Sequence, residues 1–394
     1  MSVSRLIVIA GETSGDRLGA QLLAELNTRV QFESAGIGGP ALQQQGLQCW
    51  WHADELAVFG LVEVLRHLPR LLRLRRQLLQ RIVAWQPDLV ITIDAPDFNL
   101  PLAKKLRQRG IRVLHYVCPS VWAWRQGRVQ TLRQATDRVM CLLPFEAQFL
   151  HRHQVTASYT GHPLVALLQQ YQQQPRHAPQ RLRDQLGLSS DDTVLALMPG
   201  SRESEIQRLW PLFLRAAERL PQPLQIVTCA AHTGLRPWLE QQHRQLAPEL
   251  PMHWLEPADH GSWQALRVAD AALLASGTIT LEAMLLATPM VVSYRLHALS
   301  WLLLKQLRLY KAAYVSLPNL LAAEPVVPEL LQDQATPSRL VAALLPLLGE
   351  AGRIQQQRLR ELSERMLLGQ QTAAAQPVST AAAVVCAMLS PDYS

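Results

Sequence analysis

Short apolar runs alternate with amphipathic stretches of helical period along most of the chain. Each run is followed by a polar turn and then by a helical pattern, as expected of strands buried on both faces of a parallel sheet. The runs lie at residues 6–9, 89–93, 111–117, 139–143, 193–198, 224–227, 270–275 and 289–294. This alternation predicts an α/β fold with doubly wound parallel sheets.

A glutamine-rich stretch interrupted by prolines separates two such series and has little to bury. We therefore predict an N-terminal Rossmann-like domain over residues 1–168 and a linker over 169–189. A second Rossmann-like domain follows over 190–365, and a helical tail over 366–394. A chain of 394 residues is long enough for each domain to bury its own core.

The composition narrows the classes of function. Arginine carries most of the net charge of +7, which suits contact with phosphates on nucleic acid, nucleotide sugars or lipid head groups. The five cysteines form no C-x-x-C pair, so neither a disulfide framework nor a zinc site is indicated, and a reducing cytosol is expected. No apolar run reaches about 18 residues, so no membrane span is predicted.

The turn after the first strand, residues 10–16, carries the first candidate site. It lacks both the dinucleotide G-x-G-x-x-G and the Walker spacing, so neither NAD nor ATP is indicated. Glycines 11 and 15 would let it approach a ligand, and three side chains supply polar contacts: Glu12, Ser14 and Asp16. Asp16 could instead cap a helix. The glycine-rich segment 35–40 reads as another turn.

Two carboxylates follow the strand at residues 89–93. Asp94 and Asp97 would lie at the carboxyl end of a parallel strand, where open sheets bind their ligands. Asp97 can act as a general base on a bound substrate, aimed by the rigid Pro96. The structural alternative is that Asp97 caps the helix that follows.

The segment from Val58 to Arg81 has an unusual pattern of leucine and arginine. Leucines 61, 65, 68, 72 and 79 fall on one side of a helical wheel, and arginines 66, 70, 73, 76 and 81 on the other. Pro69 should kink or split this helix. The helix could pack on its own sheet, or it could dock on an anionic membrane. The predicted membrane-facing residues are Val58, Phe59, Leu61, Arg66, Arg70, Arg73 and Arg76. Nucleic acid is disfavoured because no aromatic residues are interleaved with the arginines.

The second half of the chain carries two phosphate-like turns. Pro199-Gly200-Ser201-Arg202 follows one strand, and Ser276-Gly277-Thr278 follows another, with Glu282 one turn into the next helix. Glycine turns present amides to phosphate, arginine binds it, and a glutamate can accept hydrogen bonds from ribose hydroxyls. The alternatives are a plain βα turn with a surface arginine, and an acid favoured by a helix N-terminus.

Two later segments complete the pattern. Residues 299–309 are strongly apolar and form a second candidate surface for a membrane or for another copy of the chain. Residues 316–321 read as a proline-fixed loop.

Taken together, the motifs resemble one family, the lipid-A-disaccharide synthases. The similarity covers nearly the whole chain and rests on six motifs in order, at residues 10–16, 93–99, 119–125, 199–202, 275–278 and 314–321. Cys118 stands where a serine is expected, but the neighbouring Pro119-Ser120 is kept. The resemblance implies the GT-B architecture, with two Rossmann-like domains facing a central cleft.

The resemblance also implies a reaction: 2,3-diacylglucosamine is transferred from UDP to 2,3-diacylglucosamine 1-phosphate (lipid X), with inversion. The product is a β-1,6-linked disaccharide. By this likeness Asp97 is the base, and Arg202, Glu282, Asn319 and Gln332 hold UDP. Glu12, Ser14 and Asp16 would line the cleft, and no metal or cofactor is required. The enzyme would work peripherally on the cytoplasmic face of a Gram-negative inner membrane.

Two other functions fit part of the pattern. A UDP-GlcNAc 2-epimerase-like isomerase can share the fold and the donor half of the site, but it needs neither an acyl-binding face nor an acceptor. A non-catalytic nucleotide-sugar-binding membrane protein would not need the carboxylate of Asp97.

Overall fold

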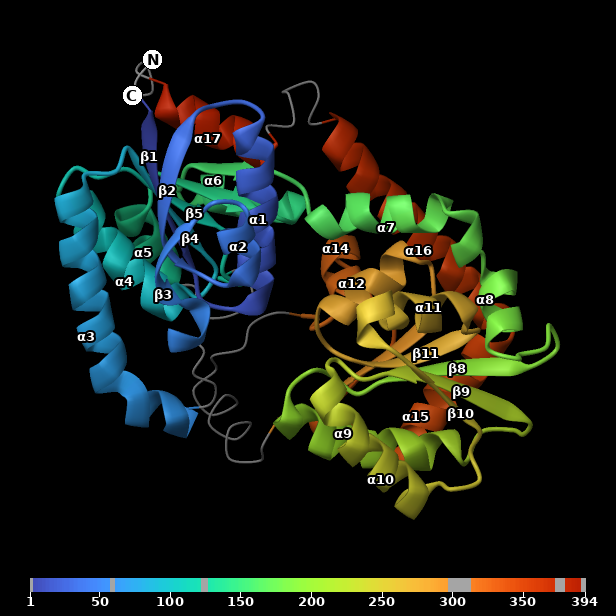
Figure 1. Cartoon of the computed structure of the whole chain (residues 1–394). Helices are drawn as coiled ribbons and strands as arrows, with labels where there is room; N and C mark the ends of the chain where they lie inside the picture. Colours follow the sequence, from blue (N-terminus) through green and yellow to red (C-terminus); the bar gives the residue numbers. More distant parts are fainter. Residues whose placement is uncertain (1–2, 57–60, 122–126, 297–312, 373–379, 391–394) are drawn as a thin grey trace. The chain divides into compact units, whose positions relative to one another are not determined.

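The computed structural model describes residues 3–56, 61–121, 127–296, 313–372 and 380–390. The chain forms two compact units, each with its own sheet and core (Figure 1). The first comprises Met1–Pro163 and Gly369–Ser394, and the second comprises Leu164–Leu368. The C-terminal segment therefore belongs to the first unit, although it follows the second in sequence.

The sheet of the first unit is parallel, and its described strands have the order β3-β2-β1-β4-β5-β6-β7. The strands are β1 (Ser4–Ala10), β2 (Phe32–Gly38), β3 (Gln48–His52), β4 (Leu89–Ile93), β5 (Val113–Tyr116), β6 (Arg138–Cys141) and β7 (Ala157–Tyr159). The order reverses between β1 and β4, and the helices that follow these strands, α1 (Thr13–Asn27) and α4 (Pro96–Arg107), pack on opposite faces of the sheet. This is a topological switch point, where such sheets bind ligands.

Helices cover both faces of this sheet (Figure 1). They are α1 (Thr13–Asn27), α2 (Pro40–Gln44), α3 (Leu61–Trp85), α4 (Pro96–Arg107), α5 (Arg128–Ala135), α6 (Pro144–Arg152) and α17 (Ala381–Leu389). One core contains Leu78 and Ile82 of α3, and the other contains Val385 and Met388 of α17, which packs beside α1. Pro96 and Pro144 occupy first turns, where a missing N–H costs nothing.

The second unit repeats the design with the order β10-β9-β8-β11-β12-β13, again parallel in the described residues. Its strands are β8 (Thr193–Met198), β9 (Leu224–Cys229), β10 (Met252–Leu255), β11 (Ala271–Ala275), β12 (Met290–Tyr294) and β13 (Glu329–Leu331). The switch point lies between β8 and β11. The fully buried Trp210 and Phe213 anchor its core.

The helices of the second unit complete both of its outer layers (Figure 1). They are α7 (Pro163–Gln173), α8 (Pro179–Gln185), α9 (Glu203–Ala217), α10 (Arg236–Leu246), α11 (Gly261–Val268), α12 (Thr278–Leu285), α14 (Leu317–Ala322), α15 (Pro337–Leu344) and α16 (Glu350–Thr372). The fold class predicted from the sequence, doubly wound parallel sheets in two Rossmann-like domains, is confirmed.

Several local expectations differ from the structure. The glycine-rich segment 35–40 is not mainly a turn, because residues through Gly38 belong to β2. Gly36 lies so close to β1 that an added Cβ would be 2.0 Å from the carbonyl oxygen of Val8, so glycine is needed here for strand packing.

The proline-containing segments are also more regular than expected. The segment predicted as linker, 169–189, holds the end of α7 and all of α8 and lies within the second unit. Pro69 does not split α3, which is helical from Leu61 to Trp85. The proline-fixed loop at 316–321 is largely a short helix, α14, because Pro318 suits a first turn.

Candidate active site

In the first unit, the turns after β1 and β4 lie against each other at the switch point. A Cβ placed on Gly11 would be 3.4 Å from the Cβ of Ala95 and 3.2 Å from the side chain of Leu56. Asp94 and Ala95 both have positive φ, at 50° and 43°. Because non-glycine residues rarely adopt this conformation, the β4 turn stores backbone strain of the kind often found at functional sites.

The two carboxylates of this turn have different surroundings. Asp97 lies in the first turn of α4, with its side chain 81% exposed, and forms an ion pair with Arg128 at the start of α5. Asp94 is half-buried, and its burial raises the pKa of its carboxyl. Buried Asn99 supports the turn from below, since its Nδ2 donates to the Asp94 carbonyl at 2.7 Å. The carboxylate of Asp97 is the one presented to solvent.

The polar residues after β1 have separate surroundings. Glu12 is half-buried and precedes α1, and Ser14 is exposed. Asp16 is only 3% exposed, and its carboxylate accepts bonds from the backbone N–H groups of Gly39 at 2.7 Å, Ala41 at 3.0 Å and Leu42 at 3.2 Å. Asp16 therefore holds the start of α2, a different helix from its own, while its predicted contact with substrate stays a prediction.

In the second unit, the Pro199–Arg202 turn follows β8 at the switch point. Gly200 has φ +112°, and a Cβ there would be 2.9 Å from Oε2 of Glu205. Glu205 is buried, and its Oε1 accepts bonds from Nη1 of Arg202 at 3.3 Å and from the hydroxyl of Tyr294 at 3.1 Å. The side chain of Arg202 is 64% exposed. Its guanidinium is thus anchored at one edge and accessible to an anion elsewhere.

The turn after β11 lies across the same switch point. Ser276 is tied down, since its Oγ donates to the Val315 carbonyl at 3.0 Å. Gly277 and Thr278 are exposed, and a Cβ on Gly277 would meet nothing within 4 Å, so the amino-terminal end of α12 is open to a ligand.

Glu282 is held one turn into α12. Ser262 of α11 donates its Oγ–H to Oε2 of Glu282 at 3.2 Å. Burial raises the pKa of the Glu282 carboxyl to about 7, and the hydrogen bond from Ser262 partly opposes this shift. This carboxyl therefore titrates near neutral pH.

Asn319 is almost completely buried, at 1% exposure. Its Nδ2 donates to the Val327 carbonyl at 2.9 Å and to Oε1 of Glu329 at 2.8 Å, while its Oδ1 accepts from the Val327 N–H at 2.8 Å. Its side chain therefore joins α14 to β13. These contacts give Asn319 a structural role, and its role in holding UDP stays a prediction.

Gln332 lies just after β13 and is half-buried. Its Oε1 accepts from the Leu296 N–H at 3.3 Å, and its carbonyl accepts from Nε of Arg295 at 3.3 Å. Gln332 therefore connects the carboxyl ends of β12 and β13, the same edge of the sheet as the two turns.

The leucine and arginine helix α3 packs differently from the sequence pattern. Its buried face consists of Leu74, Leu78 and Ile82, whereas Leu68 and Leu72 are 41% and 45% exposed. Arg70 pairs with Glu55, and Arg73 and Arg76 are exposed. Val58 and Phe59 lie outside the described residues, as do the side chains of Leu61 and Arg66. The 299–309 surface also lies outside them.

Three residues that contact candidate site residues were not predicted from the sequence. Arg128 contacts Asp97, Glu205 contacts Arg202, and Glu329 accepts from Ser316 as well as Asn319. Of these contacts, only that between Glu205 and Arg202 could be predicted from the sequence, because the two residues are about one helical turn apart.

Two cysteines of the first unit also lie close together, and both are free thiols. The ligand atoms of Cys118, Cys141 and Glu146 lie within 4.8 Å of one another in the core of the first unit. The Cys118 contact and burial raise the pKa of the Cys141 thiol.

In the described part of the chain, no helix is long and apolar enough to cross a membrane.

Each unit thus places candidate side chains at the switch point of a Rossmann-like sheet, and two such units in one chain define the fold class as GT-B. Solved structures are similar at the level of fold. The calicheamicin glycosyltransferase CalG4 has a TM-score of 0.58 at 15% identity, covering all of both chains. A Neisseria meningitidis UDP-GlcNAc 2-epimerase has 0.60 at 11% identity, covering 94% of this chain and 100% of that one.

Sequence comparison is more specific. A family model described as lipid-A-disaccharide synthetase matches residues 6–384. The lipid-A-disaccharide synthase of Xanthomonas campestris is 48% identical over 351 residues, which are 88% of this chain and 78% of that protein. The chain belongs to the lipid-A-disaccharide synthetase family.

Proposed function

We propose that the chain condenses UDP-2,3-diacylglucosamine with 2,3-diacylglucosamine 1-phosphate to the β-1,6-linked lipid A disaccharide 1-phosphate and UDP. Family membership supports a glycosyltransferase of lipid A synthesis rather than an epimerase. The acceptor hydroxyl oxygen bonds to the anomeric carbon of the donor as the bond to UDP breaks, so the reaction inverts that carbon. The hydroxyl proton passes to a carboxylate of the enzyme.

The exposed carboxylate of Asp97 is the observation that best supports this reaction. A general base must reach the proton it removes, and Asp97 is 81% exposed at the switch point of the first unit. Arg128 restricts where that carboxylate can lie. Glu12 and Ser14, after the neighbouring strand, are proposed to contact the substrate there, together with Asp16.

The second unit supplies the groups for the leaving diphosphate. We assign the diphosphate to Arg202 and to the open end of α12 at Ser276, Gly277 and Thr278, because developing negative charge is stabilised by fixed N–H donors. Glu282 is proposed to accept from the ribose hydroxyls. Asn319 and Gln332 remain proposed UDP contacts.

One assay tests the reaction itself. Purified protein is incubated with the UDP-diacylglucosamine donor, with and without the acceptor, and both UDP and disaccharide are followed. We expect equal amounts of UDP and disaccharide only when acceptor is present. Release of UDP that does not depend on acceptor would contradict a two-substrate transferase and favour an isomerase or a hydrolase.

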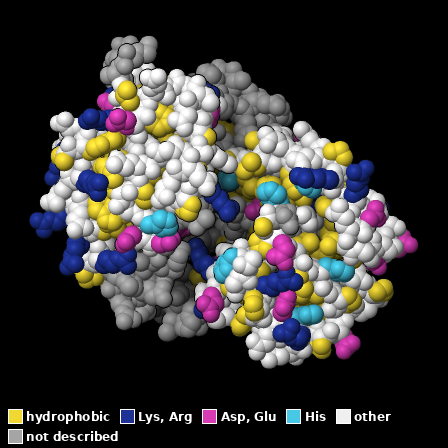
Figure 2. Space-filling model, in the orientation of Figure 1, with side chains coloured by type: hydrophobic (Ala, Val, Ile, Leu, Met, Phe, Trp, Pro, Cys, Tyr) yellow, Lys and Arg dark blue, Asp and Glu magenta, His cyan; other side chains and the backbone are white. Residues whose placement is uncertain are grey.

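We further propose that α3 docks the enzyme on the cytoplasmic face of a Gram-negative inner membrane. Its exposed residues Leu68 and Leu72 lie beside Arg73 and Arg76, a combination typical of helices that lie in an anionic interface. On the face shown in Figure 2, basic side chains border this part of the first unit with hydrophobic ones between them. Such docking would bring the enzyme to its acylated substrates.

Sedimentation with anionic vesicles tests the docking. Replacing Arg70, Arg73 and Arg76 with Glu should release the protein, because each cationic residue near the surface contributes about 1 kcal/mol. The control replaces Arg353 and Arg365 of α16, which are also exposed, with Glu. This variant should bind the vesicles as the wild type does. Equal binding of the α3 variant and the wild type would refute this surface without affecting the transferase proposal.

A further inference from the structure

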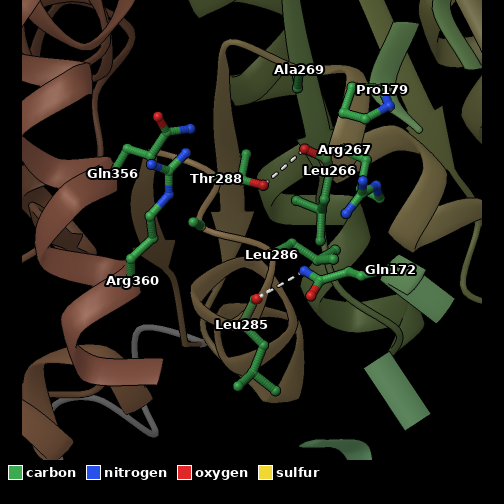
Figure 3. A pocket seen from close by; sticks show the side chains of 11 residues that line it. Gln172, Pro179, Leu266, Arg267, Ala269, Leu285, Leu286, Thr288, Gln356 and Arg360 are labelled. Carbon is green, nitrogen blue, oxygen red and sulfur yellow. Dashed lines mark hydrogen bonds between the residues drawn. The ribbon is translucent and has the colours of Figure 1, made fainter. Parts of the chain in front are cut away.

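A cavity of about 410 Å³ lies in the second unit, away from the turns assigned to UDP (Figure 3). Ala269 and Thr288 of its lining lie two residues before the starts of β11 and β12, so the cavity lies at the amino ends of these strands. The phosphate-like turns follow the carboxyl ends. A strand of five residues is about 17 Å long, which separates the two places. The cavity is therefore not part of the site already described.

The charged residues that line the cavity are both arginines. Arg267 comes from α11 and Arg360 from α16, and none of the described lining residues carries a carboxylate (Figure 3). Nε of Arg267 donates to the His177 carbonyl at 2.8 Å, and burial lowers the pKa of its guanidinium. In the described chain, Arg360 and Gln356 have no hydrogen-bonding or ionic partner. Two positive groups thus share a cavity without a counter-charge.

A neighbouring arginine shows the contrast. Arg183 is paired with Asp270, since its Nη2 donates to both carboxylate oxygens at 3.1 Å. Asp270 also accepts from the Val194 N–H at 2.8 Å, so its carboxylate is occupied. Arg183 is thus neutralised, whereas Arg267 donates to the neutral His177 carbonyl and has no carboxylate partner among the described residues.

The remaining lining restricts the ligand. Nε2 of Gln172 donates to the Leu285 carbonyl at 3.1 Å, and Oγ1 of Thr288 donates to the Leu266 carbonyl at 2.8 Å, as Figure 3 shows. These bonds hold the floor of the cavity in place. The carboxyl-terminal end of α12 contributes roughly half a negative charge, which the two guanidinium groups exceed.

We propose that this cavity binds a phosphate group through Arg267 and Arg360, with the side-chain amide of Gln356 as a further donor. Planar guanidinium groups match phosphate oxygens with paired, charge-assisted hydrogen bonds. The ligand is a phosphate monoester or free phosphate, or the head group of a phosphomonoester lipid. The site is independent of the proposed transferase activity.

Calorimetric titration of inorganic phosphate into UDP-saturated protein tests the site. We expect one saturable site that Arg360→Gln weakens about tenfold or more, since charge-assisted bonds to phosphate are strong. Arg360 is exposed, so this variant should fold normally, and Arg267→Gln should act in the same direction. Arg365→Gln, on the same helix but outside the cavity, should have no effect.

The other arms identify the ligand and separate the two sites. Arg202→Ala should leave phosphate binding at the cavity unchanged. Loss of phosphate binding in this variant would place the phosphate at the nucleotide turns instead. Absence of saturable binding, or equal weakening by Arg365→Gln, would overturn the proposal. If vesicles containing phosphatidate compete with inorganic phosphate, the ligand is a lipid head group. If they do not compete, the ligand is a soluble phosphate.

Discussion

The two switch points carry similar turns but use their polar side chains differently. In the first unit Asp97 is exposed beside a strained turn and forms an ion pair with Arg128. In the second unit, two carboxylates organise the turns: buried Glu205 holds Arg202, and half-buried Glu329 holds the segment around Asn319. The first site thus presents its acid to solvent, whereas the second uses two of its acids as internal supports.

This difference fits the chemistry that we assign to each unit. A base must be able to reach a proton and move slightly as it takes it, whereas charge on a leaving group is stabilised best by donors that are already fixed. On this assignment Asp97 is the proposed reacting group, and Glu205 and Glu329 are proposed positioning groups. Four substitutions test this comparison between the two units.

The largest effect is expected for Asp97→Asn, which removes the proposed base without changing its size. Turnover should fall about 10³-fold, while the dissociation constant of UDP stays within about twofold of wild type. Steady-state kinetics and calorimetry measure the two quantities. Asp94→Asn is the matched variant, and a turnover loss confined to Asp94→Asn would move the base to that residue.

Asn319→Ala should destabilise the second unit by about 3 kcal/mol, because it removes three buried hydrogen bonds, one of them to a carboxylate. Urea unfolding measures this. Gln332→Ala, which removes one long side-chain hydrogen bond, should cost about 1 kcal/mol or less. Unchanged stability in Asn319→Ala, together with weaker UDP binding, would show that Asn319 is a ligand contact rather than a support.

Arg202→Ala should weaken UDP binding by about 2 kcal/mol, roughly thirtyfold, because a charge-assisted contact to the diphosphate is lost. Stability should change little, since the side chain is 64% exposed. Arg208→Ala, on the helix α9 that Arg202 precedes, is the control and should bind UDP normally. Equal affinities of the Arg202 and Arg208 variants would exclude Arg202 from the diphosphate site.

The smallest effect concerns the pH dependence of Glu282. Its folded pKa of about 7 lies above the ordinary value of 4.5, so the native state binds more protons than the unfolded state between these values. This contribution to stability is present below pH 4.5 and is lost as pH rises through 7. From pH 6 to pH 8 the free energy of unfolding should fall by about 1 kcal/mol from this group.

Glu282→Gln should remove that decline, while Glu203→Gln, an exposed acid on α9, should retain it. Unfolding free energies of the three proteins at pH 6 and pH 8 give the comparison. A wild-type decline that persists in Glu282→Gln would assign it to another group.

The sequence by itself determined the fold class and the turns that carry the candidate chemistry. Strands buried on both faces need continuous apolar runs, and runs such as those of β1, β4, β8 and β11 could be recognised locally. The short or more polar strands β3, β10 and β13 were not predicted, because their pairing depends on neighbours that are distant in sequence.

Only the tertiary structure decided what each polar side chain contacts. Asp16 follows a strand as a ligand-binding residue would, yet its carboxylate is occupied by the N–H groups that begin α2. Leu68 and Leu72 belong to a leucine stripe, yet Leu74 and Leu78 face the core instead. The partners Arg128 and Glu329, and the arginine pair of the cavity, come from elements far apart in the chain. Sequence periodicity reports which side of an element is apolar, whereas packing determines what covers it and which charges remain without a counter-charge.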